Sequence, residues 1–371
     1  MDKNGLLVYV GTYTEDILFG TGQILEGKGE GIHIYRMDPD TGVLSPYSTA
    51  GQIKNPSYLA FHPNHRFLYA VNELKSYNGE ATGTLSAFSI DPDTGRLEFI
   101  NKVATQGTDP CHVTVDRAGR CALVANFASG SVAVLPIRED GGLREASEVI
   151  QHQGSSVDPV RQIGPHSHSV TLDASNRFAY VPDLGLDKLM IYRFDSENGK
   201  LETHEQGCLE TKPGAGPRHF VIHPDNSCAY LINELDSTIL SLGYDGERGT
   251  VEQIQTVSTL PQSFQGHSTC ADIMVDPRGQ FLYASNRGHD SIVIYRIDGS
   301  SGRLTLVGHE STRGETPRNF TIDPSGTFLF AANQNSDSIA CFRIDHRSGR
   351  LNPTGQVTSA PTPVCVKILR L

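Results

Sequence analysis

The chain has 371 residues, of which 37% are hydrophobic and 20% are charged, and its formal net charge at neutral pH is −11. These values are typical of a globular protein with a sizeable core. An acidic balance without clustered Lys and Arg argues against a surface for nucleic acid or for an anionic membrane. No apolar run approaches the roughly 20 residues that a membrane helix needs. We therefore expect neither nucleic acid nor a membrane as a partner.

Two features bear on the location of the protein. Its seven cysteines are scattered and form no CxxC pair, a pattern typical of buried, unpaired thiols in a reducing compartment. The first residues, Met1 to Gly5, lead directly into a short apolar run, without the basic region, apolar region and cleavage site of a secretion signal. The sequence therefore predicts a cytoplasmic protein.

A glycine-containing turn followed by a strand-like run recurs seven times along the chain. The copies span residues 38–44, 91–97, 139–143, 196–201, 246–251, 299–304 and 346–351. Each copy has glycine where a tight hairpin needs a positive φ angle. This recurrence indicates seven repeats of one structural unit.

Each turn is preceded by three strand-like runs. The first run is entered through a proline, as in residues 56–63, 217–224 and 317–324, and the second is densely apolar and ends in a polar residue, as in residues 67–72. The third run alternates, as in residues 292–295. These three runs are strands A, B and C of a unit, and the strand after the turn is strand D. The pattern predicts that A and B are buried on both faces, whereas C and D lie nearer the rim.

The unit length is about 50 residues, since Pro165 to Pro217 is 52 residues and Pro217 to Pro317 is 100. Four short strands at this period are typical of a propeller blade, so we predict an all-β, seven-bladed β-propeller with four antiparallel strands per blade. The first blade, from Leu6 to about Ser48, lacks strand A, and residues 363–369 supply a matching strand. The C-terminal strand therefore completes blade one and closes the ring without an open edge. We expect a single propeller domain over residues 1–371.

Antiparallel strands place all D-to-A and B-to-C connections on one face of the ring. The longest insertions, residues 14–29, 73–82, 151–165 and 261–268, belong to these connections. Polar residues at the adjoining strand ends should therefore converge on the mouth of the central channel, where a propeller places its ligand. They are Glu73, His112, His166, His168, Asp183, Arg218, His219, Glu234, His267, Arg287, Arg318 and Asn319.

Three arginines stand out against the acidic composition. Arg218 begins strand A and Glu234 follows strand B of the same blade, so the two can form either a structural salt bridge or part of a binding site. Arg287 occupies the position of Glu234 in the next blade, and Arg318 repeats the position of Arg218 two blades later. The planar fork of arginine suits carboxylates and phosphates. The set favours an anion-binding site.

His166 and His168 are two residues apart, on one side of an extended strand. Three interpretations remain open for them: a metal-binding pair, for which no third ligand stands at a recognisable spacing, a histidine that transfers protons or holds substrate, and a hydrogen-bonded core histidine. We expect no metal and no cofactor.

Asparagine recurs at the end of strand B. Because it does so in most blades, we expect its side chain to form a structural hydrogen bond to a neighbouring loop. These asparagines are Asn72, Asn126, Asn233, Asn286 and Asn333.

Over essentially its whole length the chain resembles the seven-bladed lactonase family, which includes propeller-type 6-phosphogluconolactonases and fungal 3-carboxy-cis,cis-muconate lactonising enzymes. The resemblance is carried by residues 216–219 (Gly-Pro-Arg-His), 233–235 (Asn-Glu-Leu), 270–273 (Cys-Ala-Asp-Ile), 285–287 (Ser-Asn-Arg) and 317–320 (Pro-Arg-Asn-Phe). It implies that His168, with His166 as a nearby competitor, Arg218, Glu234 and Arg287 are the catalytic positions. One departure is Met274, where relatives often carry histidine.

The residues and the resemblance agree on an anionic lactone, or its open-chain acid, as the ligand. In hydrolysis, Glu234 or His168 would take a proton from the attacking water, and an arginine would stabilise the oxyanion. Substrate-binding candidates are Glu73, His112, His166, His219, His267 and Arg318. Three alternatives are a lactonising cycloisomerase, a ligand-binding propeller without turnover, and a metal-dependent lactonase. We expect a monomer or a small homo-oligomer.

Overall fold

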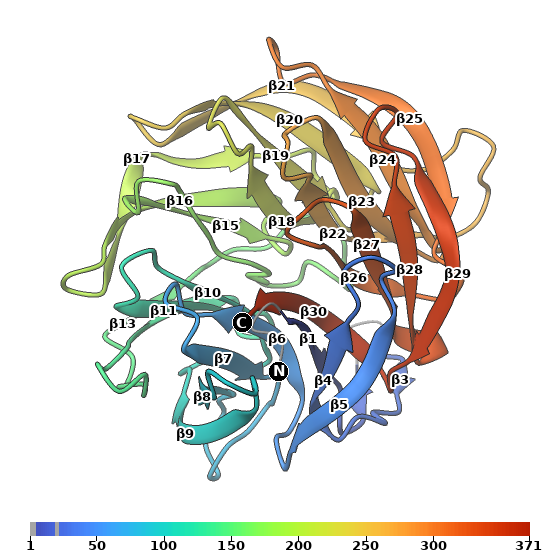
Figure 1. Ribbon diagram of the computed structural model, residues 1–371. Helices are drawn as coiled ribbons and strands as arrows, with labels where there is room; N and C mark the ends of the chain where they lie inside the picture. The colour runs from blue at the N-terminus through green and yellow to red at the C-terminus, as the bar shows by residue number, and fades with distance from the viewer. Residues whose placement is uncertain (1–4, 19–21) are drawn as a thin grey trace.

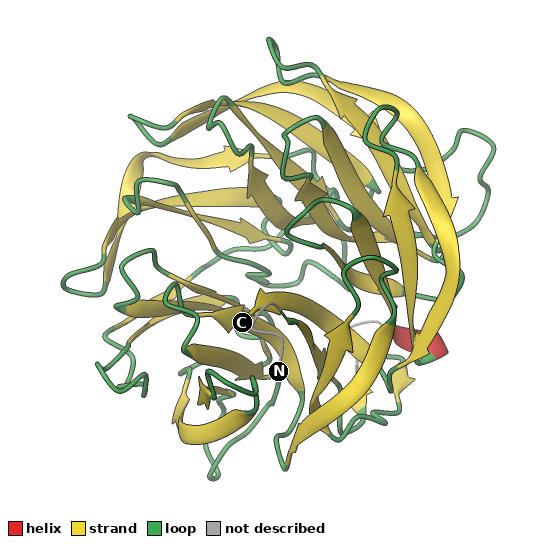
Figure 2. Cartoon of the chain, in the orientation of Figure 1, coloured by secondary structure: helices red, strands yellow, loops and turns green. Residues whose placement is uncertain are grey.

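Nearly all regular structure in the chain is β-strand. The computed structural model describes residues 5–18 and 22–371. Within them, seven sheets of four antiparallel strands form a ring (Figure 1), and a short hairpin and a single-turn helix are the remaining elements (Figure 2). The N-terminal residues 1–4, part of the stretch examined for a secretion signal, and residues 19–21 of the first insertion lie outside the described residues.

The strands follow one another in the predicted order, and each sheet is one blade. Blade one contains β30 (Pro363–Arg370), β1 (Leu6–Thr12), β4 (Gly31–Met37) and β5 (Leu44–Gly51). Blade two contains β6 (Pro56–Phe61), β7 (Phe67–Asn72), β8 (Thr84–Ile90) and β9 (Leu97–Ala104). Blade three contains β10 (Pro110–Val115), β11 (Cys121–Asn126), β12 (Ser131–Pro136) and β13 (Glu148–Gln151). Blade four contains β14 (Thr171–Leu172), β15 (Phe178–Asp183), β16 (Lys188–Asp195) and β17 (Lys200–Glu210).

The remaining three blades repeat this arrangement. Blade five contains β18 (Pro217–Ile222), β19 (Cys228–Asn233), β20 (Thr238–Asp245) and β21 (Thr250–Ser258). Blade six contains β22 (Thr269–Val275), β23 (Phe281–Arg287), β24 (Ser291–Ile297) and β25 (Leu304–Ser311). Blade seven contains β26 (Pro317–Ile322), β27 (Phe328–Asn333), β28 (Ser338–Ile344) and β29 (Leu351–Ser359), with the helix η1 (Gln334–Ser336) after β27. The insertion in blade one forms the hairpin of β2 (Ile17–Leu18) and β3 (Ile24–Leu25).

The C-terminal strand closes the ring as predicted. β30 pairs antiparallel with β1, from Leu6 opposite Arg370 to Gly11 opposite Cys365. The start of β1 and the end of β30 therefore lie on the same face of the ring (Figure 1). The seven-bladed architecture with four antiparallel strands per blade is confirmed.

The burial of the strands differs in two respects from the prediction, for strand A and for strand C. Strands B and C are the most buried, as in β7, β8, β11 and β12, because the hydrophobic clusters form between neighbouring blades and cover both faces of these strands. The inner strands A are only partly buried toward their ends, as in β6 and β18, because one face lines the central channel. Placing strand C near the exposed rim was wrong; only strand D has the alternating exposure of an outer strand, as in β29.

The recurring turn glycines adopt the predicted conformation. Their φ angles lie between 61° and 81°, a range that residues with a Cβ atom rarely adopt. These glycines are Gly42, Gly95, Gly141, Gly199, Gly249, Gly302 and Gly349.

Tyrosine hydroxyls connect neighbouring blades. A tyrosine in the B strand, the fourth residue of β1 and the third residue in the other blades concerned, donates a hydrogen bond to the carbonyl oxygen of the turn glycine in the next blade. Five such bonds of 2.7–3.0 Å join Tyr9 to Gly95, Tyr69 to Gly141, Tyr180 to Gly249, Tyr230 to Gly302 and Tyr283 to Gly349. Blades three and seven have Leu123 and Phe330 at this position. The bonds add to the apolar contacts between blades and to further polar ones, such as the bond from Ser147 to the carbonyl oxygen of Gly199.

The asparagines at the ends of the B strands have the predicted structural role. The side-chain amides of Asn72, Asn126, Asn286 and Asn333 donate to carbonyl groups of the connection that enters their own blade. Asn233 instead donates to the hydroxyl of Thr238. Each bond holds the top connection against the end of a buried strand.

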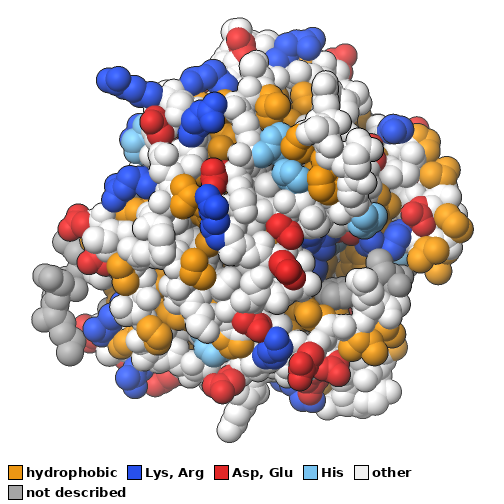
Figure 3. Space-filling model, turned by 90° about the vertical axis from the view of Figure 1, so that its right-hand side faces the viewer, with side chains coloured by type: hydrophobic (Ala, Val, Ile, Leu, Met, Phe, Trp, Pro, Cys, Tyr) orange, Lys and Arg blue, Asp and Glu red, His pale blue; other side chains and the backbone are white. Residues whose placement is uncertain are grey.

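The outer surface shows no segregation of charge on the side seen in Figure 3, where acidic and basic side chains are interspersed. In the part of the chain that the structure describes, no helix is long and apolar enough to span a bilayer.

Removing one inter-blade hydroxyl should weaken the ring without unfolding it. We expect Tyr283→Phe to lower the free energy of unfolding by about 1–2 kcal/mol, because the buried carbonyl of Gly349 loses its donor. Urea unfolding should show a lower midpoint with an unchanged slope. Tyr283→Leu, which also removes the packed ring, should cost more. An unchanged midpoint for Tyr283→Phe would show that the hydrogen bond contributes nothing to stability.

Candidate active site

A single buried carboxylate, that of Glu234, gathers three arginines at the mouth of the channel. Its Oε1 lies 2.7 Å from Nη2 of Arg161, and its Oε2 lies 3.0 Å from Nε of Arg218 and 2.9 Å from Nη2 of Arg287. Glu234 is 4% exposed and Arg218 is 2% exposed. The structure therefore places the three predicted residues 218, 234 and 287 in direct contact.

The direction of Arg218 follows from an irregularity at the start of strand β18. The pairing register with β19 shifts between Pro217 and His219, so Arg218 is the extra residue of a β-bulge. A bulge re-aims the side chain that it contains. The same shift occurs at the start of β26, where it contains Arg318. This explains why these arginines lie at the mouth, whereas the residues after them line the channel.

Backbone carbonyls hold two of the arginines in place. Nη1 of Arg218 donates to the carbonyl oxygen of Ala271 at 2.6 Å, and Nη2 of Arg287 donates to that of Cys270 at 2.8 Å. Nε of Arg287 is buried and has no hydrogen-bond partner within the described residues. One directed donor of this guanidinium thus remains unused.

Arg161 is the member of the Glu234 cluster that the sequence did not reveal. It lies in the insertion 151–165, whose position on this face was predicted, but no motif or repeat singles out an arginine in a loop. Asp158 accepts hydrogen bonds from the backbone of Val160 and Arg161, and Gln162 donates to the carbonyl of Leu184. The loop is thereby fixed, and Arg161 covers Glu234 from the solvent side with 17% of its side chain exposed.

His168 lies beside this cluster. Its Nε2 is 4.0 Å from Oε2 of Glu234, and its Nδ1 is 3.8 Å from Sγ of Cys111. Burial, with the positive charge of Arg218, holds the pKa of His168 well below the usual histidine value. The imidazole is therefore neutral at physiological pH and can accept a proton.

The carboxylate of Glu234 remains ionised. Burial alone would raise its pKa, but Arg287, Arg161 and Arg218 together hold the pKa of Glu234 well below its usual value. A carboxylate of this kind is a weak base. It is better suited to fixing guanidinium groups than to accepting a proton.

A second cluster at the mouth contains Glu73, Tyr13 and Arg318. The hydroxyl of Tyr13 lies 3.1 and 3.0 Å from the two carboxylate oxygens of Glu73, and the guanidinium carbon of Arg318 lies 5.6 Å from the centre of the Tyr13 ring. Within the described residues Arg318 forms no ion pair at salt-bridge distance. Glu73 and Arg318 thus lie near each other at the mouth, as predicted, but apart from the ion pairs of Glu234.

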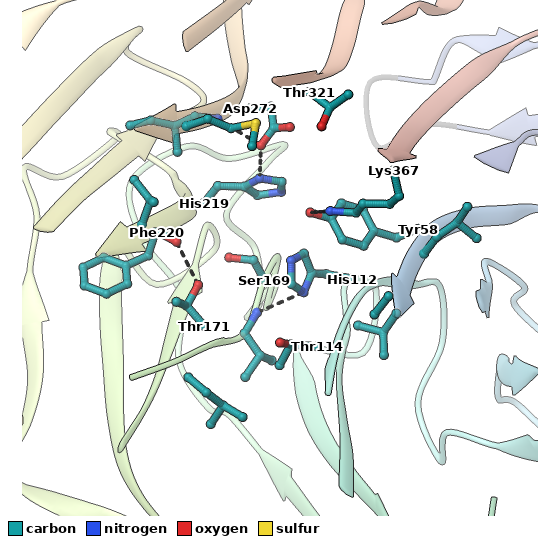
Figure 4. A pocket seen from close by; sticks show the side chains of 18 of the residues that line it. Tyr58, His112, Thr114, Ser169, Thr171, His219, Phe220, Asp272, Thr321 and Lys367 are labelled. Atoms are coloured by element: carbon teal, nitrogen blue, oxygen red, sulfur yellow. Dashed lines mark hydrogen bonds and ion pairs between the residues drawn. The ribbon is translucent and has the colours of Figure 1, made fainter. Parts of the chain in front are cut away.

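His112 and His219 lie one layer deeper, inside the channel (Figure 4). Nδ1 of His219 donates to Oδ1 of Asp272 at 2.8 Å, and its Nε2 accepts from Nη1 of Arg218 at 3.1 Å. Burial, with the charge of Arg218, lowers the pKa of His219 to about 4. His219 thus connects the arginine cluster to Asp272, which is held in turn by the predicted Asn319.

Two of the predicted histidines make no contact with the arginine cluster. The ring of His166 stacks on Phe127 with centroids 4.7 Å apart, and its Nδ1 bonds to the carbonyl of the same residue. His267 lies on the mouth face, next to Gly288, but its side chain is exposed. These two side chains do not join the arginine cluster, contrary to the prediction. Stacking on Phe127 fixes the ring of His166, and the long insertion places the side chain of His267 in solvent.

The structure also shows the surroundings of the cysteines and of the buried polar residue Asp183. All seven cysteines are unpaired, and six are buried.

Asp183 accepts a hydrogen bond from the backbone of His166, and its carboxylate lies 2.6 Å from Nδ1 of His152. It therefore anchors both ends of the insertion that carries Arg161. No group of three or more His, Cys, Asp or Glu side chains arranged for a metal ion is present among residues 5–18 and 22–371.

Comparison with known proteins adds the family context. A family model described as "Lactonase, 7-bladed beta-propeller" matches residues 7–368. A 6-phosphogluconolactonase of Bacillus subtilis is 36% identical over 361 residues, 97% of either chain. Among solved structures, a periplasmic gluconolactonase of Pseudomonas aeruginosa has a TM-score of 0.90 and 36% identity over 99% of both chains. A putative 6-phosphogluconolactonase of Bacteroides fragilis has a TM-score of 0.89 and 34% identity, over 99% of this chain and 98% of its own.

Neutralising Glu234 should destabilise the fold at neutral pH. We expect Glu234→Gln to lower the free energy of unfolding by about 3–5 kcal/mol, because Arg218 is left buried without its counter-charge. A carboxylate with a depressed pKa stabilises the fold above its unfolded pKa of about 4.3 and loses that contribution as the pH falls further. The difference in the free energy of unfolding between variant and parent should therefore have its full size at pH 7 and decrease only below about pH 4.3.

Chemical unfolding at several pH values measures this difference. The control is Glu205→Gln, which removes a similar ion pair, that with Arg193, from the exposed surface and should change little. A Glu234→Gln protein as stable as the parent at pH 7 would contradict the prediction.

Proposed function

The chain belongs to the seven-bladed β-propeller lactonase family, and from this premise we propose that it hydrolyses an anionic sugar lactone of the 6-phosphogluconolactone type. The observation that carries the proposal is the arginine cluster at the channel mouth, with a neutral histidine beside it. The names of the relatives support the lactone class. The charges of the site support an anionic member of that class.

The channel mouth carries more positive than negative charge. Four arginines, at positions 161, 218, 287 and 318, face three carboxylates, Glu73, Asp109 and Glu234, which leaves an excess of one positive charge on a protein whose net charge is −11. Because the site is largely removed from water, this excess attracts an anion more strongly than a surface patch would.

The four arginines form two groups, to which we assign different roles. Arg161, Arg218 and Arg287 share Glu234, and the positive charge of these guanidinium groups would stabilise an oxygen that becomes negative during the reaction. Arg318 has no carboxylate at salt-bridge distance among the described residues. In our proposal it holds the phosphate or carboxylate group of the substrate.

His168 is the better candidate for the general base. Burial lowers the pKa of His168 and so weakens it as a base too, but the Glu234 carboxylate beside it raises that pKa, whereas Glu234 itself already balances three guanidinium groups. A protonated His168 would be stabilised by the Glu234 carboxylate, whose Oε2 lies 4.0 Å from Nε2. Glu234 thus acts as a positioning residue that orders the arginines.

The proposed reaction has two steps. Water attacks the ring carbonyl carbon while His168 takes one of its protons, and the carbonyl oxygen becomes an oxyanion that the arginines stabilise. The tetrahedral carbon then regains its double bond to oxygen as the bond to the ring oxygen breaks, and His168 returns the proton to that oxygen. The product is the open-chain acid, and the histidine is regenerated. The chemistry proposed for the chain itself uses no cofactor.

We also propose a cytoplasmic location. The seven unpaired cysteines support it, although one similar protein is described as periplasmic.

The function is tested by the rate at which the purified protein opens δ-6-phosphogluconolactone, corrected for spontaneous opening in buffer. We expect a clear acceleration by the parent protein and a loss of about 10²–10⁴-fold in kcat/KM for His168→Asn, because the proton acceptor is removed. Circular dichroism and thermal unfolding of His168→Asn serve as the folding control. No acceleration by the folded parent protein would remove this substrate.

The role of Arg318 is tested by comparing two lactones. We expect Arg318→Met to raise KM for δ-6-phosphogluconolactone by about tenfold to a hundredfold, the value of a charge-assisted hydrogen bond. For glucono-δ-lactone, which lacks the phosphate, KM should change little. The matched control is Arg313→Met, which removes an exposed arginine paired with Glu310. Equal losses with both lactones would show that Arg318 does not recognise the phosphate.

A further inference from the structure

The lower part of the central channel contains a cavity of about 420 Å³ that the proposed reaction does not use. Its lining comes from the inner strands, at residues 58–61, 112–115, 169–172 and 219–221 among others, and includes neither Glu234 nor any of the four arginines at the mouth. These strands run from the mouth face to the opposite face. The cavity therefore extends from the layer of His112 and His219 toward the face opposite the mouth (Figure 4).

Lys367 of β30 places a cation in this cavity (Figure 4). Its Nζ lies 4.6 Å from the centre of the Tyr58 ring and 3.4 Å from the Tyr58 hydroxyl, a long hydrogen bond and the only one that Lys367 forms with its side chain in the described part of the chain. An ammonium group has three donors. At least two of them remain for a ligand or for water.

The carboxylate nearby does not neutralise this ammonium directly. Asp272 also lines the cavity, but its Oδ1 accepts from His219 and from the backbone of Ile273, and its Oδ2 accepts from Asn319. No ion pair joins it to Lys367 among the described residues. Although burial opposes the charge, Tyr58, Cys365 and Asp272 raise the pKa of Lys367, which is therefore protonated at neutral pH.

Neighbouring groups offer hydrogen bonds that suit a hydroxylated anion. Nδ1 of His112 accepts from the backbone of Val170 at 3.3 Å, which leaves Nε2 to carry the ring hydrogen as a donor. The hydroxyls of Ser169 and Thr171 donate to backbone carbonyls, so their oxygens remain as acceptors. A cavity of this volume is in the range that holds small ligands.

We propose that this lower cavity is a second anion-binding site, in which Lys367, supported by His112, binds the phosphate or carboxylate group of a small hydroxylated molecule. The site is separate from the proposed catalytic cluster and faces the opposite opening of the channel. Its existence does not depend on lactone hydrolysis, because it rests on the cavity and on the incompletely satisfied ammonium.

The test is a calorimetric titration with inorganic phosphate and, separately, with gluconate. It is made in the Arg318→Met background, so that binding at the mouth is weakened. We expect at least one of the two anions to bind, and a further Lys367→Met change to weaken binding about tenfold or more. Lys367→Arg, which keeps the charge, should retain most of the affinity. Lys188→Met, at a partly exposed lysine paired with Glu210, is the matched control.

The outcomes separate the interpretations. Binding of phosphate alone or of gluconate alone identifies the group that the site recognises. Failure of both anions to bind, or equal binding with and without Lys367→Met, would overturn the proposal. Thermal unfolding checks that the variants are folded, and Lys367→Gln, which keeps a donor for Tyr58, replaces Lys367→Met if that variant is not. Lactone opening by the parent protein is measured separately, so the proposed function and the second site can fail independently.

Discussion

The shared carboxylate of Glu234 is the interaction on which the site depends. It joins Arg218 of blade five and Arg287 of blade six to Arg161 on the insertion that precedes blade four. Such a buried cluster is weak evidence for added stability, because each charge must be removed from water before it finds a partner. Its value lies in geometry: one negative group fixes three guanidinium groups that would otherwise repel one another.

The fold could be predicted from the sequence because each repeat carries its own markers. The glycine turns and the prolines set the period, and the period with antiparallel pairing decides which strand ends share a face. From that face alone, Arg218, Glu234 and Arg287 could be placed together. The pattern of apolar residues misled for strand C, since alternation does not show that a neighbouring blade will cover the second face. It also misled for strand A, since an apolar run does not show that one face will line the channel.

The rest of the site could not be predicted, because it depends on loop conformations and contacts that no sequence pattern indicates. Arg161 reaches Glu234 because Asp158 and Gln162 shape an irregular loop. His219 and Arg218 are adjacent in sequence but occupy different layers of the channel, since a bulge separates them. The stacking of His166 on Phe127 depends on two connections that the sequence does not relate. Each case involves the conformation of a segment that does not repeat.

The closure of the ring by β30 has a consequence for how the chain folds. Blade one is complete only when β1 and β30, which lie far apart in the sequence, have paired. The entropy of closing so long a loop is lost before this pairing contributes stability, so pairing of this kind is slow. We therefore expect ring closure to be a late step in folding, during which β1 presents an unpaired edge that can associate with other chains.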